Sequence, residues 1–400
     1  MSGKESRFTS DRRGPGESSW ADEADWTAGT AENVEVVGGG LVGRPPTQAG
    51  VPDSVASYRH FGAADGNLHV VDASDGSKTW TYTTGDRIYS SPAVVDGVVY
   101  VGSYDNNLHA VNASDGSEKW TYTTGGSISY SSPAVVDGVV YVGSHDGNIY
   151  AVDAEDGSQM WSYPTGDAVY SSPAVVDGVV YVANYDGRVY AIDAVDGKRK
   201  WYYDTGGRIY GSPAVVGGAV FIGNGDNWLY AIDSSDGTKL WSYFAGGSII
   251  QSSPAIVDGV LYVGCYDNKL YAINASGGSK EWTFQTGGTI RSSPTVVDGV
   301  VYFGNRDERL YAVDAADGTQ IWSYHGSGNF NNAPAVVNGV VYAGSISGEF
   351  HAVFANDGTA KWSSSIGGSL SYSSPISGAD GWCFVNRPGR IGNVKPVDPF

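Results

Sequence analysis

The sequence predicts an all-β protein made of tandem copies of one four-stranded unit. Eight tryptophans recur forty or forty-one residues apart, and each follows a glycine by four positions. Asp-Gly or Asn-Gly pairs recur between runs of β-branched residues, which is a strong hairpin signal. The composition, with 57 Gly, 27 Tyr and only 17% charged residues, is typical of a β protein with glycine turns rather than of a helical one.

The spacing of these markers defines the repeat. The tryptophans are Trp80, Trp120, Trp161, Trp201, Trp241, Trp282, Trp322 and Trp362. The glycines are Gly76, Gly116, Gly157, Gly197, Gly237, Gly278, Gly318 and Gly358. Self-similarity at a fixed period indicates a repeat architecture, here with eight units.

One unit, residues 88–125, shows how the repeat divides into strands. SSPAVV is expected as the first strand, VVYVGS as the second, LHAVNA as the third and KWTYTT as the fourth. Turns are expected at Asp96-Gly97, through 105–107 and at Asp115-Gly116. The first two strands are nearly continuous apolar runs, as expected for strands covered on both faces, whereas WTYTT alternates like a strand near an exposed edge.

Sheets covered on both faces need neighbours on both sides, and four antiparallel strands per repeat predict propeller blades. The first unit, near residues 57–84, lacks the SSPAVV strand, while SYSSPI at 371–376 is an extra copy. The C-terminal strand can therefore complete the first blade and close the ring. We predict an eight-bladed β-propeller of four-stranded antiparallel blades. Seven blades are the alternative, because 381–394 form a degenerate hairpin that this scheme does not place.

The propeller is expected over residues 56–397. Residues 1–55 share neither the repeat nor its turns and are expected to be disordered or irregular, with VEVVGGGLVG at 34–43 as a worn first hairpin. Residues 1–30 contain no apolar run, and the Arg12-Arg13 pair alone is a weak export signal. We therefore expect a cytoplasmic monomer, or a cell-surface or extracellular protein if the natural N-terminus lies upstream.

A net charge of −19 repels phosphate backbones and anionic lipid headgroups, so neither nucleic acid nor membrane insertion is expected. Asp greatly outnumbers Glu and Lys is scarce, which predicts a halophilic, acidic protein from a haloarchaeal source. The two cysteines, Cys265 and Cys383, lie far apart and are expected to be buried free thiols.

Two residue patterns resemble metal or catalytic sites but have simpler explanations. Segments such as 153–157, DAEDG, place carboxylates at a Ca²⁺-like spacing, yet they coincide with an obligatory turn in which Asp caps its own backbone. His69, His109 and His351 stand where other repeats have Tyr, so we expect packed strand residues. We predict no metal site and no catalytic residue.

Positions that vary between repeats are freer to form a binding site. The residue three before each strand-opening Pro is Tyr89, Tyr130, Tyr170, Tyr210, Gln251, Arg291, Asn331 or Tyr372. The turn after the second strand holds Tyr104, His145, Tyr185, Gly225, Tyr266, Arg306 or Ile346. Both sets are expected on one face, near the mouth of the central channel. Because Tyr and Arg are enriched in binding hot spots, we predict a partner-binding face, with wall packing by the tyrosines as the alternative.

The unit SSPAVVDGVVYVGSYDNNLHAVNASDGSEKW resembles the pyrroloquinoline quinone (PQQ) repeat, whose hallmark is an Ala, Asp, Gly and Trp pattern before the outer strand. The resemblance covers about residues 57–380 and is nearest to the non-catalytic BamB-like propellers. It implies that the eight tryptophans dock between blades and stack on the turn glycines. The family includes quinoprotein dehydrogenases, which hold PQQ and Ca²⁺ at the propeller axis, and non-catalytic propellers that bind no cofactor.

Two features favour the non-catalytic members. The dehydrogenases carry a vicinal disulfide, whereas the two cysteines here are not adjacent, and the uniform short turns leave little chain to wall a ligand. We therefore predict a scaffold for protein–protein interaction or assembly, without a cofactor. The alternatives are a PQQ-binding quinoprotein with Ca²⁺ and a ligand-sensing module.

Overall fold

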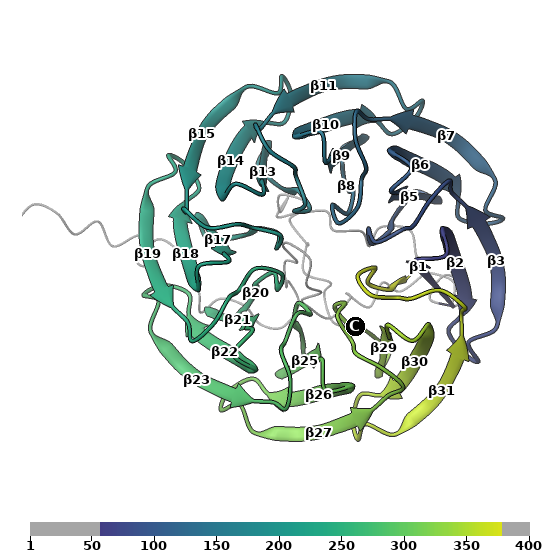
Figure 1. The fold of residues 1–400 in the computed structure, drawn as a ribbon, viewed down its shortest axis with the longest axis vertical. Helices are drawn as coiled ribbons and strands as arrows, with labels where there is room; N and C mark the ends of the chain where they lie inside the picture. Colours follow the sequence, from purple (N-terminus) through teal and green to yellow (C-terminus); the bar gives the residue numbers. More distant parts are fainter. Residues whose placement is uncertain (1–56, 378–400) are drawn as a thin grey trace, which may run out of the picture.

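Eight four-stranded antiparallel sheets stand around a central axis as the blades of a β-propeller (Figure 1). The structure is a computed structural model and describes residues 57–377. The prediction of eight blades is confirmed, and the seven-bladed alternative is wrong. Among these residues no helix is long and apolar enough to span a membrane.

Each blade runs from an inner strand at the axis to an outer strand at the rim. The inner strands of blades 1 to 8 are β32(Ile376–Ser377), β4(Ala93–Val95), β8(Ala134–Val136), β12(Ala174–Val176), β16(Ala214–Val216), β20(Ala255–Val257), β24(Thr295–Val297) and β28(Ala335–Val337). The second strands are β1(Tyr58–Gly62), β5(Val98–Gly102), β9(Val139–Gly143), β13(Val179–Ala183), β17(Ala219–Gly223), β21(Val260–Gly264), β25(Val300–Gly304) and β29(Val340–Gly344). The third strands are β2(Asn67–Asp72), β6(Asn107–Asn112), β10(Asn148–Asp153), β14(Arg188–Asp193), β18(Trp228–Asp233), β22(Lys269–Asn274), β26(Arg309–Asp314) and β30(Glu349–Phe354). The outer strands are β3(Lys78–Thr83), β7(Glu118–Thr123), β11(Gln159–Pro164), β15(Arg199–Asp204), β19(Lys239–Phe244), β23(Lys280–Gln285), β27(Gln320–His325) and β31(Ala360–Ser365).

Blade 1 is assembled from both ends of the described chain. Strand β32 pairs antiparallel with β1, with Arg59 opposite Ser377 and His60 opposite Ile376. The predicted closure by the C-terminal strand is therefore confirmed. The predictions for residues 1–55, for the run 34–43 and for the hairpin 381–394 lie outside the described residues.

The hairpin turns follow the predicted chemistry. Asp96 and Gly97 both have positive φ, 49° and 74°, as a type I′ turn requires. The inner strand, however, is shorter than predicted: SSPAVV was expected as one strand, but only Ala93–Val95 joins the ladder. Pro92 has no N–H to give to a ladder, and the N–H of Ser91 bonds to the next blade instead, at 2.9 Å from Ser132 Oγ.

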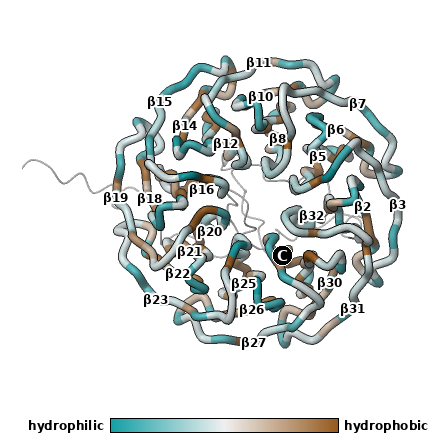
Figure 2. Tube along the Cα trace, viewed as in Figure 1, coloured by the Kyte–Doolittle hydropathy of each residue, from teal (hydrophilic) through white to brown (hydrophobic). Residues whose placement is uncertain are grey.

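The apolar core lies between adjacent blades. Tyr100 of β5 packs in one buried cluster with Val140 of β9 and Val152 of β10. The inner and second strands are almost entirely buried, whereas the outer strand β7 alternates between exposed and half-buried residues. Figure 2 shows the same division, with apolar residues inside and a largely hydrophilic rim.

A belt of indole rings joins each blade to the next. A β-bulge before each tryptophan, between Ala110 and Val111 in blade 2, sets the register of the outer strand. The Trp80 indole N–H donates to the Ala113 carbonyl at 3.1 Å, and its ring covers Gly116 so closely that an added Cβ there would lie 2.6 Å from a ring carbon. Trp362 makes the same contacts across the closing seam, with Ala73 and Gly76.

Candidate binding site at the mouth of the central channel

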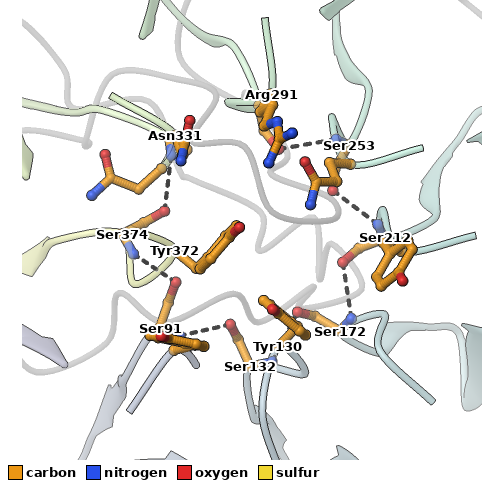
Figure 3. A pocket seen from close by; sticks show the side chains of 16 residues that line it. Ser91, Tyr130, Ser132, Ser172, Ser212, Ser253, Arg291, Asn331, Tyr372 and Ser374 are labelled. Carbon is orange, nitrogen blue, oxygen red and sulfur yellow. Dashed lines mark hydrogen bonds between the residues drawn. The ribbon is translucent and has the colours of Figure 1, made fainter. Parts of the chain in front are cut away.

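The structure gathers the variable positions of the repeat around the axis. All eight residues that stand three before the strand-opening Pro are half-buried, and seven of them line a cavity of about 90 Å³ at the channel mouth (Figure 3). The eighth, Tyr170, packs against Tyr210 with ring centroids 4.6 Å apart. At this position of the repeat, every blade except blade 4 therefore contributes a side chain to the cavity lining.

Blades 1 to 5 form the aromatic half of the mouth, defined by Tyr372, Tyr89, Tyr130, Tyr170 and Tyr210. Tyr130 lies at the centre of this group, 4.9 Å from the ring of Tyr372 and 5.8 Å from that of Tyr89. Burial among these rings raises the pKa of Tyr130. In Figure 3 the ring of Tyr372 reaches toward the middle of the opening. These side chains fill space at the axis and contact one another.

The turn residues after the second strands pack beside this aromatic half. The Tyr89 ring lies 5.3 Å from that of Tyr104, and the Tyr170 ring lies 4.5 Å from that of His145. The His145 ring bonds to Ser127 and Ser129, and burial lowers its pKa. Both predicted sets of residues therefore meet on one face, although Arg306 and Ile346 are exposed at its edge.

Blades 6 to 8 form the polar half of the mouth, defined by Gln251, Arg291 and Asn331. The Tyr266 hydroxyl donates to Gln251 Oε1 at 2.6 Å, and the Arg291 guanidinium lies over the Tyr266 ring at 5.1 Å. Burial raises the pKa of Tyr266, while the neighbouring Arg291 and Arg306 act in the opposite direction. Within residues 57–377 neither arginine forms an ion pair with a carboxylate.

A ring of serines, which the sequence analysis does not predict, lines the same cavity. At seven of the eight seams, the N–H of the residue before the strand-opening Pro donates to the hydroxyl of the same position in the next blade. The donor and acceptor pairs are Ser91–Ser132, Ser132–Ser172, Ser172–Ser212, Ser212–Ser253, Ser253–Ser293, Ala333–Ser374 and Ser374–Ser91. Its signal in the sequence is the recurring Ser-Pro dipeptide, which lies inside the predicted strand SSPAVV.

The ring is interrupted at one seam, between blades 7 and 8, because Ala333 has no hydroxyl to accept the Ser293 N–H. Figure 3 shows Arg291 and Asn331 on either side of this interruption. Arg291 Nε, Asn331 Oδ1 and Asn332 Oδ1 are buried and have no hydrogen-bond partner in the described part of the chain. A different hydrogen bond joins blades 7 and 8 at this seam. Thr295 Oγ1 donates to the Pro334 carbonyl at 2.6 Å.

The remaining candidate residues lie away from the channel mouth. Asp153 Oδ1 accepts the Glu155 N–H at 2.7 Å, so this carboxylate caps its own turn as predicted. In the described ranges, no group of three or more His, Cys, Asp or Glu side chains could hold a metal ion. Cys265 is a buried free thiol whose pKa burial raises to about 12, whereas Cys383 lies outside the described residues.

The three strand histidines are buried in the third strands. His69 Nε2 lies 3.1 Å from Asp65 and His109 Nε2 lies 3.0 Å from Asp105, each partner being in the turn that precedes the strand. His351 is 2% exposed and bonds through Nδ1 to the Tyr324 hydroxyl at 3.2 Å. They are packed strand residues, as predicted, and His109 and His351 also contact tyrosines of the preceding blade, Tyr82 and Tyr324.

Two protein-family models match the sequence. The model described as the beta-propeller of the beta-alanine-activating enzyme matches residues 49–258, slightly more than half of the chain. The model described as the outer membrane protein assembly factor BamB matches residues 245–380. The chain belongs to the propeller family of the beta-alanine-activating enzyme and is a PQQ-like β-propeller. No curated protein sequence matches it.

Solved structures show the same fold for this PQQ-like propeller. BamB from Moraxella catarrhalis is 21% identical, with a TM-score of 0.62 over 77% of this chain and 91% of that one. The computationally designed Ika8 protein is 17% identical, with a TM-score of 0.64 over 76% and 92%. A europium-containing methanol dehydrogenase is 16% identical, with a TM-score of 0.65 over 76% and 82%. At these identities the likeness shows the fold, which an assembly factor and an enzyme share, so function must be argued from the site.

Proposed function

We propose that this PQQ-like propeller is a non-catalytic scaffold that binds a protein partner across the face containing the channel mouth. The observation that carries the proposal is the surface itself: an aromatic half and an arginine-containing polar half meet around a cavity of about 90 Å³ at the channel mouth. Aromatic residues and arginine are the side chains that most often anchor protein interfaces. The residues of this face also vary between repeats that otherwise barely differ.

The channel does not fit a buried quinone. Cofactor pockets usually measure about 300–1,000 Å³, whereas the cavity here measures about 90 Å³. The rings of Tyr89, Tyr130 and Tyr372 contact one another beside the axis, where the cofactor of a quinoprotein would have to lie. This packing supports a scaffold over the alternative of a PQQ enzyme with Ca²⁺.

The charge of the face points to an acidic partner surface. In a chain of net charge −19, Arg291 lines the mouth and Arg306 is exposed at its edge, while the guanidinium of the exposed Arg208 lies over the ring of the turn residue Tyr185 at 5.0 Å. Arg291 and Arg208 are stacked on tyrosine rings and form no ion pair in the described part of the chain, so they are well placed to bind carboxylates in bidentate geometry. The match to a family model named for an assembly factor supports a protein as the partner.

A charge-matched pair of double variants tests the proposal. R291A/R306A removes two charges from the mouth, whereas K119A/K239A removes two from exposed positions on the outer strands β7 and β19. We expect partner capture, measured by quantitative cross-linking in extracts of the source organism, to fall at least tenfold for the mouth variant only. Equal capture by both variants would contradict the proposed face.

The cofactor alternative has its own test. The intact chain is titrated with PQQ in the presence of Ca²⁺ while its intrinsic fluorescence is followed. We expect no saturable change at micromolar PQQ. Saturable quenching that Y130A strengthens by enlarging the cavity would favour a quinone site instead.

A further inference from the structure

The seam between blades 7 and 8 differs from the other seven seams in a way that concerns binding. Elsewhere each backbone N–H at the serine ring already has a hydroxyl acceptor in the next blade. Here Ala333 replaces the serine, and Thr295 joins the two blades through the Pro334 carbonyl, farther along the inner strand. The blades therefore stay joined, while the donor at Ser293 is left for another acceptor.

Donors converge at this interruption from blade 7. The Ser293 N–H lacks the hydroxyl acceptor that its counterparts have, and the buried Nε of Arg291 has no partner. The Ser293 hydroxyl already accepts the Ser253 N–H at 2.9 Å, so its own hydrogen remains to be donated. The guanidinium of Arg291 points into the opening in Figure 3 and has no carboxylate to neutralise it. This side of the cavity suits a carboxylate.

An acceptor faces the same cavity from blade 8. Asn332 is 3% exposed, and its Nδ2 donates to the carbonyls of Leu370 and Ser373 at 3.0 and 3.1 Å. Those two bonds fix the orientation of the amide, so its Oδ1 is an acceptor and has no partner. A carboxylate alone cannot satisfy it, because a carboxylate only accepts. The occupant must also donate a hydrogen bond.

We infer that the interruption of the serine ring binds a carboxylate with an N–H donor beside it. This chemistry occurs at the C-terminus of a peptide and in a free amino acid. The carboxylate would accept from Arg291 and the Ser293 N–H, and the neighbouring N–H would donate to Asn332 Oδ1. The inference deepens the proposed function, on which it rests, by assigning the chemistry of the group that enters the mouth. A cavity of about 90 Å³ suits such a head group rather than a larger ligand.

Small probes separate the parts of this inference. The intact chain is titrated at one fixed salt concentration with N-acetylglycine, propionate and N-acetylglycine amide, and binding is followed by ligand-observed NMR. We expect N-acetylglycine to bind at least fivefold more tightly than propionate, which lacks the N–H, and the amide, which lacks the carboxylate, to show no saturable binding. Equal binding of propionate and N-acetylglycine would overturn the role of Asn332.

Two variants and one control locate the site. R291Q should weaken N-acetylglycine at least tenfold. A333S should weaken it at least fivefold, because the new hydroxyl gives the Ser293 N–H the acceptor found at the other seams. K119Q removes the same charge from an exposed position on the outer strand β7, away from the channel mouth, and should change affinity less than twofold. The inference would be overturned by unchanged affinity in R291Q and A333S, or by the absence of saturable binding to the intact chain.

The two sources of the head group are distinguished by comparing glycine with a short peptide and its C-terminal amide. Tighter binding of the free-acid peptide assigns a peptide C-terminus, whereas tighter binding of glycine assigns a free amino acid. The proposed scaffold function fails separately, if R291A/R306A captures partner normally. The inference fails if the probes do not bind, whatever the partner does.

Discussion

The outer belt and the channel mouth of this propeller follow opposite rules. At the belt every seam carries the same contact, an indole N–H bonded to a carbonyl of the next blade, from Trp80 with Ala113 to Trp362 with Ala73. At the mouth, one backbone position holds tyrosine in five blades and Gln251, Arg291 or Asn331 in the other three. The difference teaches that the repeat preserves the contacts that close the ring and varies the side chains that line the channel mouth.

The belt should give the largest effect on stability. Trp201 is 8% exposed, donates to the Ser234 carbonyl at 2.9 Å and covers Gly237. We expect W201A to lower the free energy of unfolding by about 3–5 kcal/mol, as for other large buried aromatic side chains. Urea unfolding at fixed salt measures the change, and R306A, at an exposed position of the mouth, should cost less than about 0.5 kcal/mol. A cost below about 1.5 kcal/mol for W201A would contradict the claim that the belt contributes most to stability.

The exceptional seam should give an intermediate effect. The Thr295 hydroxyl supplies the Pro334 carbonyl with a buried bond of 2.6 Å. Removing the donor leaves a buried acceptor unpaired, so we expect T295V, which keeps the volume, to destabilise by about 1–2 kcal/mol. T295S keeps the hydroxyl and is the matched control. Similar unfolding midpoints for the two variants would show that this bond does not secure the seam.

A strand histidine should give the smallest effect, visible only as a pH dependence. Burial lowers the pKa of His351 below its ordinary value of 6.5, so the unfolded chain takes up this proton at a higher pH than the folded chain does. The free energy of unfolding should therefore fall as pH drops through 6.5, by at most about 1.4 kcal/mol per pH unit for one group.

The repeat itself provides the control for this pH dependence. H351Y introduces the residue that several other blades carry at this position, such as Tyr311 of blade 7. The variant should lose stability less steeply between pH 7 and pH 5, as measured by thermal unfolding. His69 and His145, whose pKa values burial also lowers, remain in the variant and keep part of the slope. An identical slope in both proteins would contradict the assignment to His351.

Most of the fold could be predicted because the period of tryptophans and Asp-Gly turns counts the blades directly. The closure of blade 1 by the C-terminal strand followed from the missing and the extra SSPAVV copies. The recurring Ser-Pro dipeptide marks the positions of the serine ring but does not reveal its hydrogen bonds, because the segment before Pro92 is extended and has the pattern of a strand. Whether an extended N–H bonds within its own sheet or to the next blade is decided by packing around the axis.

The sequence predicts which variable residues lie near the channel mouth, but not which of the polar atoms there lack hydrogen-bond partners. Comparison of the repeats placed Arg291 and Asn331 among the variable positions expected near the channel mouth. The importance of Ala333 and Asn332 depends on which buried atoms lack partners, and that requires three-dimensional neighbours from blades 7, 8 and 1. Thr295 supplies a hydrogen bond between blades 7 and 8, where Ala333 lacks the serine hydroxyl. This compensation is visible only when both residues are placed in space.

Hydrogen–deuterium exchange of the chain with and without its cross-link-verified partner tests the central claim most directly. We predict that partner-dependent protection is concentrated in the segments around Tyr104, Tyr266, Arg291 and Arg306, while the outer strands β3, β7 and β19 exchange unchanged. Protection confined to the outer strands, with the channel mouth unaffected, would contradict the account.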